Sequence, residues 1–176
     1  LGDKVKLFDD GTLNAENKNI IVVGGGDTAM DCVRTAIRQK AISVKCLYRR
    51  DKENMPGSAK EVDNAIEEGI EFLWLSSPIR FIGQTKVEGV EITKMKFTGT
   101  DSSGRKKPIV LENSEYKLKA DMVIKALGFD PENLPKLFNS EDLSVSKHGT
   151  IKIDSKTMET NFSGVFAAGD IVRGAS

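Results

Sequence analysis

Three consecutive glycines near the start of the chain constrain its fold more than any other feature. They are Gly24, Gly25 and Gly26. The apolar run before them, Asn19–Val23, is rich in β-branched residues, which predicts a buried strand. The stretch after them, Thr28–Gln39, has apolar residues at helical spacing, which predicts an amphipathic helix. With Ala29 the glycines match G-x-G-x-x-A, and such a turn between a strand and a helix is typical of dinucleotide-binding α/β folds.

Each small residue of this turn has a physical reason. Gly24 permits the tight turn, Gly26 lets the backbone approach a pyrophosphate, and Ala29 lets the helix pack closely on the strand. The free N–H groups and the positive dipole end of the helix favour bound phosphates. Asp27 is unfavourable beside an anion, so we expect its carboxylate to turn away or to accept backbone N–H bonds. The alternative is a glycine-rich turn that binds nothing.

The segments beyond the turn alternate in type. Ser43–Tyr48 and Ile70–Leu75 are predicted strands, and Ser58–Glu68 between them is a predicted helix. Its first residue and Glu61 have the spacing of a capping box. This β-α-β-α-β order predicts an α/β fold of the Rossmann type, in which a parallel sheet carries helices on both faces.

The pattern changes after this unit. Between residues 79 and 118 apolar and polar residues alternate and glycines recur, which predicts an inserted antiparallel meander. Asp121–Leu127 returns to the pattern of a buried strand and is ended by Gly128. Beyond it, residues 133–146 are loop-like and residues 147–170 are expected to form short strands.

The residues at the end of the second predicted strand indicate which dinucleotide is bound. NAD-specific folds usually carry an acidic residue there, which holds the ribose 2′-OH. Here Arg49 and Arg50 stand at that position, and guanidinium groups bind phosphate bidentately. This favours NADP, with its 2′-phosphate. The alternative is a solvated loop face in which Asp51 and Glu53 pair with the two arginines.

Charge and cysteine content exclude several classes of function. Lys and Arg total 26 and Asp and Glu total 26, so no overall basic field attracts nucleic acid or a membrane, and we predict neither as a partner. No apolar stretch approaches the length of a membrane span. Cys32 and Cys46 form no CxxC and His148 is the only histidine, so we expect no metal site. Two lone cysteines fit a reducing, cytoplasmic compartment.

Four stretches in order resemble the small (beta) subunits of NADPH-dependent glutamate synthases. They are VVGGGDTAMDCVRTAIRQ (22–39), YRRDKENMPGSAKEV (48–62), EEGIEFL (67–73) and VFAAGDIVRGAS (165–176). The chain is also similar, less closely, to the equivalent domain of dihydropyrimidine dehydrogenase. The resemblance implies a flavoprotein in which one Rossmann domain binds FAD and a second, inserted into it, binds NADPH. Hydride would pass to FAD, and electrons would travel through iron–sulfur clusters to a large (alpha) subunit that forms glutamate from glutamine and 2-oxoglutarate.

The resemblance also implies domain limits and roles for single residues. Residues 1–18 would enter from the FAD domain, 19–128 would form the NADPH-binding domain, and 129–176 would return as a partial remnant of the FAD-binding Rossmann domain. Five residues would cradle the NADPH pyrophosphate: Gly24, Gly25, Gly26, Thr28 and Ala29. Arg49 and Arg50 would hold the 2′-phosphate. Ala126, Leu127 and Gly128 would edge the nucleotide site, and Gly169 and Asp170 would form a second FAD motif, with Asp170 bonded to the flavin ribitol.

Hydride transfer to flavin needs no acid–base side chain, so we assign no catalytic residue. The first FAD glycine motif and the cysteine-rich iron–sulfur region implied by the resemblance are not in the 176 residues, so we expect NADPH binding without stable FAD binding. Two alternatives stay open: a stand-alone NADPH-dependent flavin and iron–sulfur oxidoreductase with another electron acceptor, and a non-catalytic NADP-sensing module. A thioredoxin-reductase-like enzyme would need a CxxC, which is absent.

Overall fold

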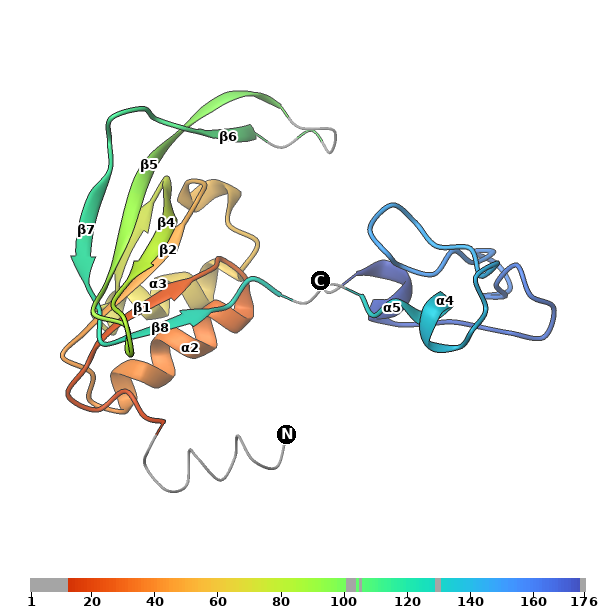
Figure 1. Ribbon diagram of the computed structural model, residues 1–176, viewed down its shortest axis with the longest axis horizontal. Helices are drawn as coiled ribbons and strands as arrows, with labels where there is room; N and C mark the ends of the chain where they lie inside the picture. Colours follow the sequence, from red (N-terminus) through yellow and green to blue (C-terminus); the bar gives the residue numbers. More distant parts are fainter. Residues whose placement is uncertain (1–12, 101–103, 105, 129–130, 175–176) are drawn as a thin grey trace. The chain divides into compact units, whose positions relative to one another are not determined.

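The computed structural model describes residues 13–100, 104, 106–128 and 131–174, and the chain divides into two compact units. The first is Leu1–Leu127 and the second is Gly128–Ser176 (Figure 1). The assignment of residues 1–18 and 129–176 to a flavin-binding domain stays a prediction.

A parallel four-stranded sheet forms the centre of the first unit. Its strand order is β3-β2-β1-β8, and every neighbouring pair is parallel. The strands are β1 (Asn19–Val23), β2 (Ser43–Tyr48), β3 (Glu71–Trp74) and β8 (Met122–Lys125). The crossovers contain α2 (Asp27–Arg38), the short 3-10 turn η1 (Lys52–Asn54) and α3 (Ala59–Glu67). The predicted α/β class and the order of its first five elements are confirmed.

Helices α2 and α3 cover one face of this sheet. Alternate strand residues such as Val22 and Cys46 point toward this face and pack against Met30, Val33 and Val62 from the helices. All five are buried. The apolar residues that recur at helical spacing in α2 therefore pack on the sheet, as predicted, and cover one face of strands that are apolar on both sides.

An antiparallel meander covers the opposite face. It comprises β4 (Ser76–Ile82), β5 (Gly89–Thr100), β6 (Lys106–Val110) and β7 (Tyr116–Lys119), with β5 pairing all three others. Val90 and Ile92 of β5 are buried against Ile21 and Leu47 of the parallel sheet. The predicted meander is confirmed, but the prediction of helices on both faces is wrong in this respect. The apolar alternation of β5 supplies the cover that a second layer of helices would give.

The start of α3 differs from the predicted capping box. Ser58 is its N-cap residue, but the Ser58 side chain makes no capping hydrogen bond. Glu61 instead forms an ion pair with Arg34 of α2, and Arg34 also pairs with Glu68 at 2.8 Å. These charges join the outer surfaces of the two helices, so a contact between helices takes the place of a local cap.

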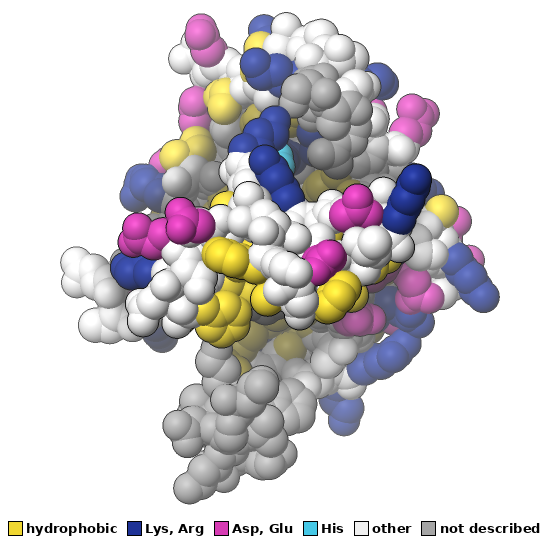
Figure 2. Space-filling model, turned by 90° about the vertical axis from the view of Figure 1, so that its right-hand side faces the viewer, with side chains coloured by type: hydrophobic (Ala, Val, Ile, Leu, Met, Phe, Trp, Pro, Cys, Tyr) yellow, Lys and Arg dark blue, Asp and Glu magenta, His cyan; other side chains and the backbone are white. Residues whose placement is uncertain are grey.

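The second unit has little regular structure among its described residues. Its helices are the single turns α4 (Leu134–Leu137) and α5 (Asp170–Arg173). The predicted short strands over 147–170 are reduced to isolated bridges, Val145 to Ile151 and Glu159 to Phe166. Several of its large hydrophobic side chains are exposed. Figure 2 shows such hydrophobic side chains at the molecular surface among acidic and basic ones.

Candidate nucleotide-binding site

The glycine turn lies where the carboxyl ends of three strands meet. Gly24 follows β1, and its N–H donates to Leu47 O of β2 at 3.1 Å. On the other side, Ala126 N–H donates to Val23 O at 2.8 Å. Gly24 has φ +150°, and a Cβ at this position would lie 2.2 Å from Ala126 O. Only glycine fits this position, because both the backbone angle and the neighbouring backbone exclude a side chain.

The next two glycines differ in what surrounds them. A Cβ on Gly25 would lie 2.4 Å from ring carbons of Tyr48, so the turn lies directly against this aromatic ring. A Cβ on Gly26 would meet nothing within 4 Å. The space beside Gly26 is therefore open, as an approaching ligand requires, whereas Gly25 is packed into the protein.

Helix α2 begins at this open position. Gly26 is its N-cap residue and provides no side-chain cap. Gly26 O accepts the N–H groups of Ala29 and Met30, so the amides of Asp27 and Thr28 are the ones without an intrahelical acceptor. Thr28 is exposed on the first turn, and Ala29 is fully buried against the sheet. The packing role predicted for Ala29 is confirmed. The first helical turn can present backbone N–H groups and the Thr28 hydroxyl to a phosphate.

Asp27 is turned toward the protein, as we expected from the repulsion of an anion. Its Oδ1 accepts the Ser58 N–H at 2.8 Å. Gly57 N–H donates to Gly25 O at 2.9 Å, one residue before this contact. The segment after β2 is thereby tied to the glycine turn at its far end, and the Asp27 carboxylate is occupied by a backbone donor.

Cys46 lies beneath the turn. Its thiol donates to Gly24 O at 3.4 Å, and it is fully buried. Burial raises the pKa of the Cys46 thiol to about 12, and burial also raises the pKa of Cys32. Both thiols are therefore protonated at neutral pH, and the nucleophilic thiolate form is scarce at either residue.

The two arginines that follow β2 differ in their exposure to solvent. Arg49 is exposed at the end of the strand, whereas Arg50 is only 5% exposed. Arg50 Nε–H donates to Lys106 O of β6 at 3.1 Å, and Arg50 O accepts Leu75 N–H at 3.0 Å. Arg49 can reach a ligand from this position, while Arg50 joins the strand end to the meander.

Asp51 organises the loop after the arginines. Its side chain accepts the Asn54 N–H at 3.0 Å and the Asn54 side-chain amide at 2.5 Å, and its backbone begins η1. Partial burial acts to raise the pKa of Asp51, but the bonds from Asn54 and the charge of Lys106 outweigh it, so this pKa lies below its usual value. Asp51 is therefore an anion at neutral pH, engaged by its own loop.

The remaining predicted residues fall into two groups. Ala126 is buried beside Gly24, Leu127 is 68% exposed, and Gly128 has φ +81°. In the second unit, Gly169 has φ +80° and precedes α5, whose first residue Asp170 is exposed. The structure thus brings Ala126 to the glycine turn of its own unit, and it places Gly169 and Asp170 together at a helix start.

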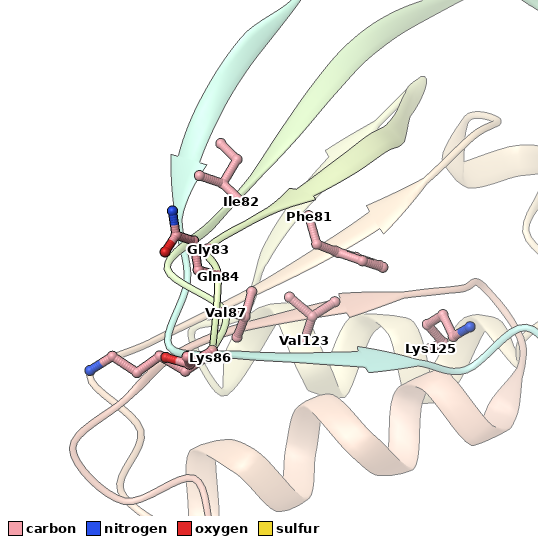
Figure 3. Close-up of a pocket in the computed structure, with 9 residues that line it drawn as sticks. Phe81, Ile82, Gly83, Gln84, Lys86, Val87, Val123 and Lys125 are labelled. Carbon is pink, nitrogen blue, oxygen red and sulfur yellow. The ribbon is translucent and has the colours of Figure 1, made fainter.

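A separate pocket of about 340 Å³ opens between the meander and β8. Figure 3 shows Phe81 of β4 above Val123 of β8, with Val87 beside Val123 and Lys125 farther along β8. None of the predicted cofactor-binding residues lines it. Over the described residues, no group of three or more His, Cys, Asp or Glu side chains could hold a metal ion. None of the described helices has the length and apolarity needed to cross a membrane.

Sequence reasoning missed several residues that shape the site. Tyr48 packs on Gly25, and the Tyr48 hydroxyl donates to Asn54 O at 2.8 Å. Gly57 N–H and Ser58 N–H donate to Gly25 O and Asp27 Oδ1 of the turn, and Lys106 O of the meander accepts from Arg50 at the end of β2. The Pro56-Gly57 pair marked a loop in the sequence, but nothing in the sequence marked the contact of Lys106 with a segment more than fifty residues away.

Comparisons with known proteins agree with this architecture. The chain is 57% identical over its full length to the small chain of glutamate synthase (NADPH) from Azospirillum brasilense, of which it covers 36%. It is 43% identical over 97% of its length to the putative oxidoreductase AegA of Escherichia coli, of which it covers 26%. The chain therefore spans about a third or less of the length of these relatives.

A solved structure supports the fold. Thioredoxin reductase of T. acidophilum matches with a TM-score of 0.72 at 20% identity, over 96% of this chain and 48% of that one. The sequence pattern of the pyridine nucleotide-disulphide oxidoreductases matches residues 3–176. The chain belongs to the pyridine nucleotide-disulphide oxidoreductase family.

Proposed function

We propose that the first unit binds NADPH with its pyrophosphate at the glycine turn. The observation that carries this proposal is the open space beside Gly26, at the start of a helix whose first two amides, those of Asp27 and Thr28, have no intrahelical acceptor. Asp27 at the helix start accepts the Ser58 N–H, which offsets part of the repulsion that its carboxylate would exert on a phosphate. Gly24, Gly25 and Ala29 shape the turn, and Thr28 adds a hydroxyl donor at its edge.

The nucleotide preference rests on the end of β2. Arg49 is exposed there and can bind the 2′-phosphate of NADPH with its guanidinium fork. Arg50 supports the same group by holding the strand end against β6 through its buried guanidinium. The predicted arginine pair thus becomes one direct ligand and one positioning residue. Ala126, Leu127 and Gly128 would border the nicotinamide side of the site.

In the longer protein, we propose that this domain serves the transfer of a hydride from NADPH to FAD. NADPH supplies the hydride when bound. The residues of this chain bind and orient the nucleotide, and the segment with Gly169 and Asp170 would contribute to the flavin site. We propose that the electrons then pass through iron–sulfur clusters bound by other residues to a large subunit that forms glutamate. The support for a glutamate synthase is the name of the Azospirillum brasilense relative, the small chain of glutamate synthase (NADPH).

A second function has specific support. The similarity to AegA, named a putative oxidoreductase, fits a flavoprotein that passes electrons to another acceptor. The test is NADPH oxidation by the longer protein with a glutamate synthase large subunit. Oxidation that requires glutamine and 2-oxoglutarate supports the first function. Oxidation that proceeds only with artificial acceptors supports the second. Absence of flavin reduction by NADPH would contradict both and leave a sensing module. The cytoplasmic location stays a prediction.

Nucleotide binding itself is tested by calorimetric titration of the chain with NADPH and NADH. We expect tighter binding of NADPH, and loss of that preference in Arg49→Ala. Arg38→Ala is the matched control, since Arg38 is exposed in the last turn of α2, about 16 Å along the helix from its start. Equal affinity of the unmodified chain for both nucleotides would overturn the role of Arg49. Binding of neither would overturn the site.

A further inference from the structure

We propose that Lys106 supplies a second cation to the 2′-phosphate site, from the meander and across the loop from Arg49. This inference rests on the proposed NADPH site and adds to it a specificity-determining residue that lies far from the glycine turn in sequence. Lys106 is the first residue of β6, and it contacts the loop after β2 with both its backbone and its side chain.

The backbone of Lys106 is fixed to the nucleotide side of β2. Its carbonyl accepts the Arg50 Nε–H at 3.1 Å, and Arg50 is buried. Arg50 directly follows Arg49, so this hydrogen bond joins the start of β6 to the end of β2 beside Arg49. This contact explains why a buried arginine follows an exposed one: its guanidinium brings the meander to the edge of the nucleotide site.

The side chain of Lys106 points toward the same loop. Its Nζ lies 3.7 Å from Asp51 Oδ2 and 5.1 Å from the ring centre of Phe97. The side chain is half exposed. An ammonium group has three N–H donors, and the long contact with Asp51 uses at most one of them. Lys106 therefore holds a defined position over the loop and retains donors for an anion.

The charge of the loop makes this cation necessary. A 2′-phosphate beside Arg49 comes close to Asp51, whose negative charge would repel it. Asn54 satisfies Asp51 Oδ1 with two hydrogen bonds but brings no positive charge. Among the described residues, Lys106 is the one cation that forms an ion pair with Asp51. It offsets the charge of Asp51 and adds attraction for the phosphate, whereas a nucleotide without a 2′-phosphate gains nothing from it.

The probes are 2′,5′-ADP and 5′-AMP, which differ in the 2′-phosphate alone. In calorimetric titrations of the chain we expect Lys106→Gln to weaken binding of 2′,5′-ADP about tenfold, because a charge-assisted hydrogen bond has about this strength. Binding of 5′-AMP should change less than about twofold. Lys106→Arg keeps the charge and should retain most of the preference.

Lys107→Gln is the matched control, because Lys107 is the neighbouring exposed residue of β6 and its side chain points to the opposite face of the strand. It should leave both affinities unchanged. The inference is overturned if Lys106→Gln weakens both probes equally, if it weakens neither, or if Lys107→Gln has the same effect. If the unmodified chain binds 2′,5′-ADP no better than 5′-AMP, the proposed NADPH preference itself is wrong, whatever Lys106 contributes. A preserved thermal midpoint in Lys106→Gln shows that the variant is folded.

Discussion

The two units of the chain use their hydrophobic residues in opposite ways. The first unit buries them on both faces of one sheet, with Val22 toward the helices and Ile21 toward the meander. In the second unit, Leu143 and Ile151 are the buried hydrophobic residues among those described, while Phe138 is 66% and Phe166 is 62% exposed. A unit with so few buried apolar groups gains little from the hydrophobic effect, so we expect a much lower stability for the second unit.

Their hydrogen bonds differ in the same sense. In the first unit, β1 pairs with β8 across about a hundred residues of sequence. In the second unit, typical backbone bonds close short loops, such as Ser146 N–H to Thr150 O and Thr160 N–H to Val165 O. Local turns of this kind open independently of one another, whereas a sheet opens as a whole. The candidate nucleotide site therefore belongs to the first unit, whose sheet opens cooperatively. The predicted flavin motif belongs to the second unit, whose hydrogen bonds are mostly local.

The largest effect should follow from adding a methyl group at the glycine turn. Gly24→Ala would place a Cβ 2.2 Å from Ala126 O, in a backbone conformation reserved for glycine. Overpacking and strain together should cost about 4 kcal/mol and abolish NADPH binding. The measurement is urea unfolding followed by fluorescence of Trp74, the only tryptophan, which lies in the first unit.

The control for this substitution lies in the second unit. Gly164 also has a positive φ, +80°, but a Cβ there would meet nothing within 4 Å. Gly164→Ala should leave the Trp74 transition unchanged, because any strain falls on a local turn of the other unit. Equal shifts for both variants would break the distinction between the units.

A smaller but still large effect is expected in the core between sheet and meander. Ile92→Ala removes a fully buried side chain and should lower the free energy of unfolding by about 3 kcal/mol. Leu137→Ala removes a side chain that is 61% exposed and should change it by less than about 0.5 kcal/mol. Hydrogen exchange of the two variants sharpens the comparison, since only the first should accelerate exchange in β1 and β2. A similar loss of stability in both would show that the second unit has a core of its own.

The elements around the glycine turn could be predicted from the sequence because their signals are local. The strand over Asn19–Val23 was found with its observed bounds, and the helix after it to within one residue. The meander was recognisable because apolar residues alternate in β5. Its place on the sheet was not, because alternation shows that one face of a strand is buried but not what buries it.

The sequence predicts which residues form the candidate site, but not which of them face a ligand and which hold the others in place. Arg49 and Arg50 are chemically identical in the sequence, and only one is buried. The difference arises from the Lys106 carbonyl, which lies 56 residues away in the chain. The predicted capping box is not formed for the same reason, because Glu61 forms an ion pair with Arg34 of the neighbouring helix. Contacts between distant segments decide such cases, and a single sequence carries no record of them.

A moderate effect of pH follows from Glu68. The hydrogen bond from Arg34 lowers the pKa of Glu68 below its ordinary value of 4.5. Since the folded state favours the charged form, this contribution to stability is fully present above the ordinary pKa and is lost as the pH falls through the folded value. The melting temperature, followed by Trp74 fluorescence, should therefore fall as the pH is lowered below 4.5. Glu68→Gln should make the melting temperature less dependent on pH in this range.

The second unit supplies the control for this dependence. Hydrogen bonds from the backbone N–H groups of Lys156 and Thr157 lower the pKa of Asp154, within one turn. Asp154→Asn should leave the acid dependence of the Trp74 signal unchanged, because the turn it closes belongs to the local unit. A flattening as large as that of Glu68→Gln would mean that the two units unfold together.

The smallest expected effect is on the rate at which a thiol reagent alkylates the buried Cys46. Cys46 has a pKa of about 12 and is buried, so at pH 8 only about one thiol in ten thousand is ionised, and alkylation must wait for unfolding of the first unit. Ser163→Cys would add a thiol at an exposed position of the second unit, and it should react at the rate of a free thiol.

In the presence of NADPH, labelling of Cys46 should slow further, because a ligand of the native state reduces the unfolded fraction. The rate at residue 163 should stay the same, since opening of a local turn is not linked to that equilibrium. Protection of both thiols by NADPH would contradict the separation and show that nucleotide binding stabilises the whole chain as one cooperative body.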